Sequence, residues 1–102
     1  MLKENRIGQV VSFKTTSGDE VVGKVAGQTA EELTVAYPVI LAASAQGLGM
    51  VPFLMTASPE LEVAFKMSHV VCIAPTNQQV ADAYTQQTTG IVAVRNPGII
   101  TG

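Results

Sequence analysis

The fold is decided within residues 9–27, which read QVVSFKTTSGDEVVGKVAG. In the first half, Val11, Phe13 and Thr15 alternate with other residues, which is the period of a β-strand with one buried face. The second half alternates in the same way. Between them, Gly18 can adopt the positive φ that a tight turn needs. The stretch therefore predicts a β-hairpin.

A glycine interrupts the second strand of this hairpin. Gly23 lies between Val21 and Val25 on one face of the strand, where a glycine removes side-chain packing and weakens the strand. Such a glycine marks a bulge, a sharp bend or the close approach of another backbone. We expect one of these at Gly23, as small barrels require where their strands curl.

The rest of the chain continues the β pattern and ends in a helix. Residues 42–49 are small and uncharged, which predicts a loop or a flexible hairpin end. Thr76 or Asn77 is the expected helix N-cap and Gly90 the expected stop. The elements predicted beyond the hairpin are strands at 33–41, 50–56, 61–67 and 70–74, with Pro38 at an edge or break of the first, and a helix at about 77–89.

The composition predicts self-association. The chain has 102 residues, enough for one domain, and is 47% hydrophobic but 14% charged. An average soluble domain is roughly 25% charged. Because a small domain has a large surface relative to its volume, so few charges leave apolar surface exposed unless a partner covers it. A second copy of the chain is the simplest partner.

Charge and hydropathy exclude several classes of partner. The net charge of −2 argues against duplex DNA, which requires many basic side chains, although a local pocket for single-stranded bases stays compatible with it. The longest apolar stretch, residues 37–45, is far shorter than the roughly 20 residues of a membrane helix. The first six residues are mostly polar and mixed in charge, with no hydrophobic signal core behind them. We expect a soluble, cytoplasmic protein without membrane contact.

No catalytic motif is recognisable. A triad around His69, the single histidine, would need Ser68 or Cys72 and a carboxylate, and the spacing does not favour one. Cys72 lies in an apolar run, which predicts a small buried side chain. The carboxylates flank turns without His or Cys neighbours suited to a metal. We therefore expect no enzyme, no catalytic residues, no metal and no cofactor.

The order of elements resembles the Sm-like (LSm) family, including Hfq-type rings and especially the divergent Sm-like proteins of bacteriophages. The resemblance covers roughly residues 8–75. Residues 63–73 are similar to the second Sm motif. The first Sm motif is matched by Val11, Phe13, Gly18, Val21, Gly23, Val25, Leu33 and Val35.

The resemblance implies a small barrel of five bent antiparallel strands. Here it would carry an extended hairpin between strands 3 and 4 and one C-terminal helix, so that residues 1–90 form a single domain and 91–102 a tail. In the family, the fourth strand of one subunit pairs with the fifth of the next, which implies a homo-oligomeric ring of five to seven subunits. Two features depart from the pattern: residues 1–7 are barely long enough for the usual N-terminal helix, and residues 42–59 are longer than a minimal Sm loop.

The family's RNA-binding residues are replaced here. Sm proteins use Asp and Asn in the loop after the second strand, where this chain has residues 28–32, QTAEE, and Arg or Lys with Gly before the last strand, where it has residues 67–69, MSH. Amide, hydroxyl and imidazole groups can still bind a base edge or a phosphate, or they can cap turns and contact water. The candidate RNA-binding residues are Gln28, Thr29, Lys66, Ser68 and His69.

Two functions follow from these observations. The first is an Sm-like ring that binds single-stranded RNA and regulates it, of bacterial or phage type. The second is a structural or protein-interaction ring without an RNA ligand, in which residues 42–57 and the C-terminal tail engage protein partners. The low basic charge and the replaced pocket favour the second, whereas the resemblance to the Sm-like family favours the first, which is the function that we expect.

Overall fold

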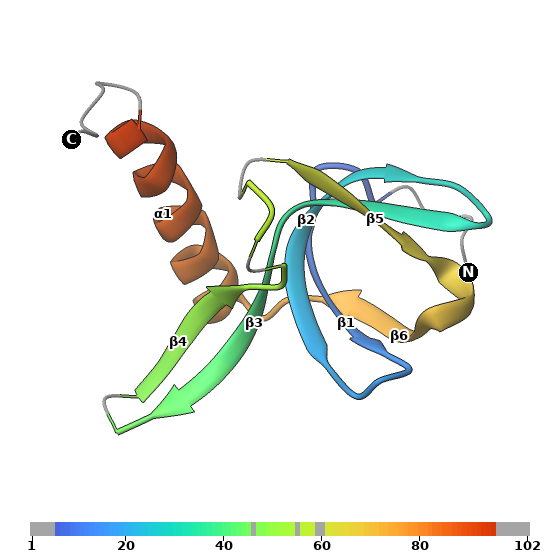
Figure 1. The fold of residues 1–102 in the computed structure, drawn as a ribbon, viewed down its shortest axis with the longest axis horizontal. Coiled ribbons are helices and arrows are strands. Elements are labelled where there is room, and N and C mark those ends of the chain that lie inside the picture. The colour runs from blue at the N-terminus through green and yellow to red at the C-terminus, as the bar shows by residue number, and fades with distance from the viewer. Residues whose placement is uncertain (1–5, 46, 55, 59–60, 96–102) are drawn as a thin grey trace.

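The protein is mainly β. The computed structural model describes residues 6–45, 47–54, 56–58 and 61–95. Within these ranges the chain forms an antiparallel sheet of six strands, a short 3-10 helix (η1) and a C-terminal α-helix (Figure 1). The elements are β1 (Val10–Thr15), β2 (Glu20–Gln28), β3 (Glu32–Ser44), β4 (Gly47–Pro52), β5 (Glu62–Lys66), η1 (Met67–His69), β6 (Val70–Pro75) and α1 (Gln78–Arg95).

The long strand β3 connects two parts of the sheet. Strands pair in the order β4-β3-β2-β1-β6, and β5 also pairs with β3. Residues 32–36 of β3 pair with β5, and residues 39–44 pair with β4, so β4 projects from the body as an arm (Figure 1). The sheet curls until β5 and β6 approach each other, joined by η1. In the described part of the chain these two strands do not pair with each other.

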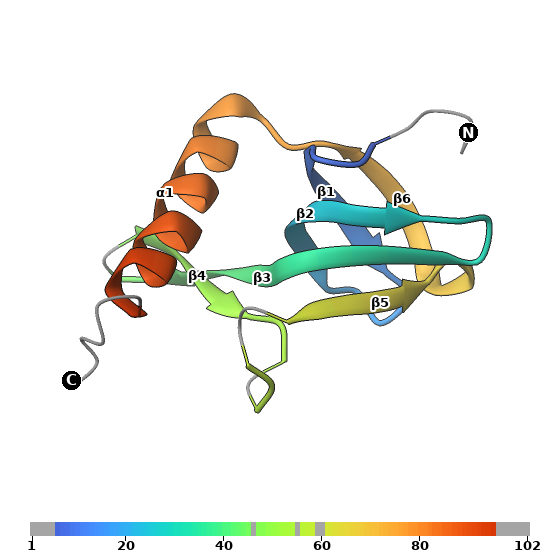
Figure 2. The same ribbon diagram turned by 90° about the horizontal axis from the view of Figure 1, so that it is seen from above.

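The sheet buries side chains on both faces. The alternation predicted for β1 is confirmed, since Val11, Phe13 and Thr15 are 0%, 2% and 8% exposed. The opposite face of the sheet packs against α1, which lies with β4 at one end of the molecule (Figure 2). The core inside the curl is formed by Val11, Phe13, Val21, Val25, Leu33 and Val35, and the core under α1 by Val22, Val39 and Tyr84.

Gly23 lies at a bulge, as its position in the strand predicts. It faces two residues of β3, Tyr37 and Pro38. A Cβ on Gly23 would overlap Cγ1 of Val35 and stand 3.3 Å from the carbonyl oxygen of Ala36. Tyr37 has a φ of 48°, in the left-handed region that strains a residue with a Cβ. Both a bulge and a close backbone approach are therefore present.

The hydroxyl of Tyr84 enters this bulge from α1. It donates to the carbonyl oxygen of Ala36 at 2.7 Å and accepts the N–H of Lys24 at 3.1 Å. Tyr84 is 2% exposed, and burial raises its pKa from 10.0 to about 12, although the hydrogen bond from Lys24 acts to lower it. The helix is thus tied to the sheet through one phenol group.

Two segments differ from the predicted boundaries. Residues 42–49, expected as a loop or hairpin end, belong largely to β3 and β4, with Ala45 in the turn that follows β3. The helix runs to Arg95 and passes Gly90, the expected stop. One internal glycine costs a helix roughly 1 kcal/mol, which the following residues can offset. The expected tail therefore begins as helix, and residues 96–102 lie outside the described residues.

The prediction of a buried thiol at Cys72 is wrong, because Cys72 is exposed. Among the described strands, β6 pairs only with β1 and lies at the end of the pairing order. Nothing in that part of the chain covers the outer side of β6, and Val71 is 63% exposed. An apolar run on such a strand is not enclosed by its own subunit.

Candidate functional site

The two connections that carry the candidate residues are neighbours. The N–H of Met67 donates to the carbonyl oxygen of Glu31 at 2.8 Å, and Lys66 is the cross-strand partner of Glu32. We call this end of the molecule, residues 28–32 and 66–69, the loop site. It lies opposite α1 and β4 (Figure 2).

Thr29 stabilises the β2–β3 turn. Its Oγ1 accepts the N–H groups of Glu31 at 3.2 Å and of Glu32 at 3.0 Å, and its own N–H donates to the carbonyl oxygen of Glu32 at 2.9 Å. The hydroxyl also lies 3.5 Å from that oxygen. Thr29 therefore matches the alternative reading, in which it caps a turn, and its hydroxyl has little capacity left for a ligand.

Gln28, at the end of β2, is in the opposite situation. Both its Nε2 and its Oε1 are buried and have no hydrogen-bond partner among the described residues. A buried polar group left unpaired costs roughly 1–3 kcal/mol. The amide is thus an unsatisfied donor and acceptor, and a bound group would pair with it only if the side chain turned outward.

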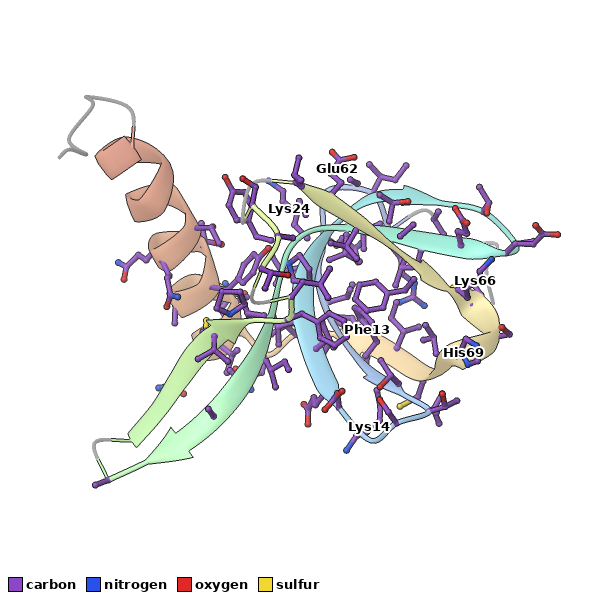
Figure 3. All side chains as sticks on the ribbon, in the orientation of Figure 1. Phe13, Lys14, Lys24, Glu62, Lys66 and His69 are labelled. Carbon is purple, nitrogen blue, oxygen red and sulfur yellow. The ribbon has the colours of Figure 1, made fainter. Side chains whose placement is uncertain are left out.

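The other candidate residues lie around η1. Figure 3 places Lys66 and His69 beside η1, with Phe13 inside the curl. His69 Nδ1 lies 3.3 Å from Oγ1 of Thr16, and its carbonyl oxygen accepts the N–H of Thr16 at 2.9 Å, so His69 ties the β1–β2 turn to η1. Lys66 and Ser68 are exposed. The structure gathers Gln28, Thr29, Lys66 and Ser68 at one end and turns His69 toward a third loop.

The charges at the loop site are mixed. Exposed Glu31 and Glu32 stand on the turn, and the cross-strand partner of Glu32 is the cation Lys66. Phosphate groups bind where positive charge is in excess, and here the carboxylates offset it. The site is better suited to hydrogen bonding with uncharged polar groups than to holding a phosphate backbone.

A groove runs beside β5, next to the loop site. Its volume is about 440 Å³, and it combines an aromatic floor, where Phe53 and Phe65 have ring centroids 5.1 Å apart, with a hydroxyl-bearing rim from the β1–β2 turn. Leu54 at its border is 43% exposed. We call it the β5 groove; it is lined by Thr15, Thr16, Ser17, Phe53, Leu54, Val63, Ala64, Phe65, Lys66 and His69.

Sequence reasoning missed the part that Phe53 and Leu54 play in this groove. Residues 50–56 were expected to form an extended strand, but β4 ends at Pro52 and the chain then leaves the sheet. The N–H of Phe53 still bonds the carbonyl oxygen of Pro38 at 2.9 Å, which holds the segment against β3. Pro52 is the one local signal of this exit, because proline ends regular strand pairing.

No group of three or more His, Cys, Asp or Glu residues that could hold a metal ion exists in the described ranges. No helix within those ranges is both long and apolar enough to cross a membrane.

Comparison with known proteins adds no family. No family model matches the sequence, and no curated protein is significantly similar to it.

Proposed function

We propose that the chain is a non-enzymatic β-module that assembles head to tail into a closed ring through the edges of β5 and β6. The observation that carries this proposal is the direction of the outer backbone groups of β5. The N–H of Met67 points at Glu31 on β3, and antiparallel residues alternate in direction. The N–H and C=O groups of Lys66, Ala64 and Glu62 therefore point away from β3.

The edge of β6 offers a matching set. The N–H of Thr76 donates to the carbonyl oxygen of Val10 at 3.1 Å, so by the same alternation the N–H and C=O groups of Ile73 and the C=O group of Pro75, which has no N–H, point away from β1. The two edges lie at opposite ends of the path β5-β3-β2-β1-β6. Pairing β5 of one copy with β6 of the next is a heterologous contact, and a rotation that closes produces a ring.

Apolar side chains beside the two edges support the same pairing. Val71 on β6 is 63% exposed, and Leu54 beside the β5 groove is 43% exposed. A neighbour's β6 added to β5 brings its Val71 toward the groove that Leu54 borders, and burying apolar surface favours association by roughly 25 cal/mol per Å². The resemblance to Sm-like proteins implies this strand pairing and five to seven subunits. Low charge, 14% of residues, fits a surface shared between copies.

Ala64→Pro tests the ring. The N–H of Ala64 points away from β3, so proline there removes a donor from the proposed interface and none from the subunit's own ladder. We expect native mass spectrometry to find a closed ring of the parent and mostly monomer of Ala64→Pro, with similar far-UV circular dichroism. The control, Ala64→Ser, keeps the N–H and should keep the ring. A parent that is monomeric at micromolar concentration, or a ring that tolerates Ala64→Pro, would contradict the proposal.

A second candidate function, binding of single-stranded RNA at the loop site, is favoured by the unpaired amide of Gln28. An amide can pair with the polar edge of an unstacked base. Because carboxylates stand beside Lys66, such binding would rest on base contacts and depend only weakly on salt.

Gln28→Ala tests this second function. With a fluorescent uridine- or adenine-rich oligonucleotide, we expect Gln28→Ala to lower affinity about tenfold, the equivalent of about 1.4 kcal/mol. The free energy of unfolding should not fall by more than about 1 kcal/mol, since the lost amide has no partner. Gln86→Ala, which removes an exposed amide from α1, is the matched control. A parent protein that binds neither oligonucleotide would leave the ring without an RNA ligand.

A further inference from the structure

The outer edge of β4 carries exposed backbone groups that the ring does not use. The N–H of Phe53 points at Pro38 on β3, and alternation from that bond directs the N–H and C=O groups of Met50 and Leu48 away from β3. Unpaired edges of this kind template pairing with another strand unless they are blunted. Pro52 blunts one end, because proline has no N–H.

The charges that commonly protect a strand edge are missing here. Residues 37–58 contain no Asp, Glu, Lys or Arg. In addition, β4 contains Gly47 and Gly49, which have no side chains to project from the strand. Val51 is 38% exposed. At Met50 the protection comes instead from α1, since Gln87 Nε2 donates to the outward carbonyl oxygen of Met50 at 3.4 Å.

The helix that provides this cover is held by few contacts. Val80 and Tyr84 are its side chains in the core beneath it, and the other positions from 78 to 87, except a half-buried Ala81, are exposed. The Tyr84 hydroxyl is its polar anchor, bonded to Ala36 and Lys24 inside the bulge. Among the described residues α1 meets this edge at Met50, so its release would free the outward backbone groups of Met50 and join them to those of Leu48 as one open edge.

We propose that α1 is a displaceable cover over Met50 on the edge of β4, latched by the Tyr84 hydroxyl, and that the uncovered edge pairs with β4 of a second copy. The outward residues define the register: Leu48 of each copy pairs with Met50 of the other, and the two-fold axis passes between the two Gly49 residues. Two uncharged surfaces meet in this arrangement without like-charge repulsion. The contact is independent of the β5 and β6 edges.

The test compares variants that loosen the cover. Tyr84→Phe removes the latch, Gln87→Ala removes the cap on Met50 from an exposed position that the core does not need, and Tyr37→Phe is the tyrosine control. Analytical ultracentrifugation is run on variants that also carry Ala64→Pro, which blocks the proposed ring contact. Pairing through β4 is then measured as a monomer–dimer equilibrium, whether or not the parent forms rings. We expect Tyr84→Phe and Gln87→Ala to dimerise at least about tenfold more tightly than their parent, and Tyr37→Phe to match the parent.

Met50→Pro identifies the contact. Proline removes the outward N–H of Met50 and no bond to β3, so it should abolish the dimers of both loosened variants. Dimers that persist with Met50→Pro would place the contact elsewhere and overturn the proposal. Dimer dissociation constants of Gln87→Ala and Tyr84→Phe within about twofold of the parent's would also overturn the proposal. If Tyr84→Phe does not fold, the result for Gln87→Ala decides between the two outcomes.

Discussion

Gly23→Ala is expected to lower the free energy of unfolding by about 3 kcal/mol, because overpacking at a site that cannot relax costs roughly 1–3 kcal/mol or more. The added Cβ overlaps Cγ1 of Val35, a β-branched side chain that is 0% exposed. It also stands 3.3 Å from the carbonyl oxygen of Ala36, a backbone atom that moves only with β3. Neither of these two neighbours can move without a large cost in free energy, so the bulge itself must distort.

Gly27→Ala is the matched control on the same strand. A Cβ there would meet Thr34 at 3.6 Å, an ordinary contact. Replacing glycine by alanine at a compatible position changes stability by less than about 1 kcal/mol and often raises it. Urea unfolding of both variants and the parent at one protein concentration measures the difference. Equal urea midpoints for Gly23→Ala and the parent would contradict this prediction, because they would mean that the bulge accommodates the added Cβ without loss of stability.

Much of the sheet follows from local pattern. The alternation of Val11, Phe13 and Thr15 places one face in the core, and Gly23 marks the bulge, because a side-chain period and a missing Cβ are properties of a short stretch of chain. Tyr84 is also buried. Its bonds to Lys24 and Ala36 were not predictable, since they join residues 60 and 48 positions apart and depend on the bulge that both strands form together.

The exposure of Cys72 was missed for a different reason. An apolar run has the same sequence on an enclosed strand and on an edge strand, and only the pairing order shows that β6 is an edge.

The two connections that carry the candidate residues are neighbours, but no ligand is known for them, so the site stays a prediction. The nearness of the β2–β3 turn and η1 follows from the strand order that the resemblance implies. The difference between Thr29, engaged in its turn, and Gln28, buried without a partner, depends on side-chain directions that one sequence does not encode in any local period. Phe53 and Leu54 enter the groove because the chain leaves the sheet after Pro52.

Tyr84→Phe is expected to lower the free energy of unfolding by about 2–4 kcal/mol, since each buried polar group that loses its partner costs roughly 1–3 kcal/mol. The phenyl ring still fills the core under α1, so the loss comes from the N–H of Lys24 and the carbonyl of Ala36. Tyr37→Phe is the control, and urea unfolding should place it within about 1 kcal/mol of the parent. A Tyr84→Phe variant as stable as Tyr37→Phe would show that the N–H of Lys24 and the carbonyl of Ala36 are satisfied within β2 and β3 without the Tyr84 hydroxyl.

The same hydroxyl makes the stability depend on alkaline pH. Folding raises the pKa of Tyr84 from 10.0 to about 12, because burial disfavours the phenolate. The folded state therefore holds its proton more tightly than the unfolded chain, so this contribution is complete below pH 10 and is lost as pH rises toward about 12. The stability difference between the parent and Tyr84→Phe should shrink across that window.

A spectroscopic titration isolates this group. The chain has two tyrosines, so the Tyr37→Phe variant retains Tyr84 alone. Its phenolate absorbance near 295 nm should rise with a midpoint near pH 12 when the protein is folded, and near pH 10 in urea. A folded midpoint near pH 10 would mean that water reaches the Tyr84 hydroxyl, and that the bulge between β2 and β3 opens without unfolding.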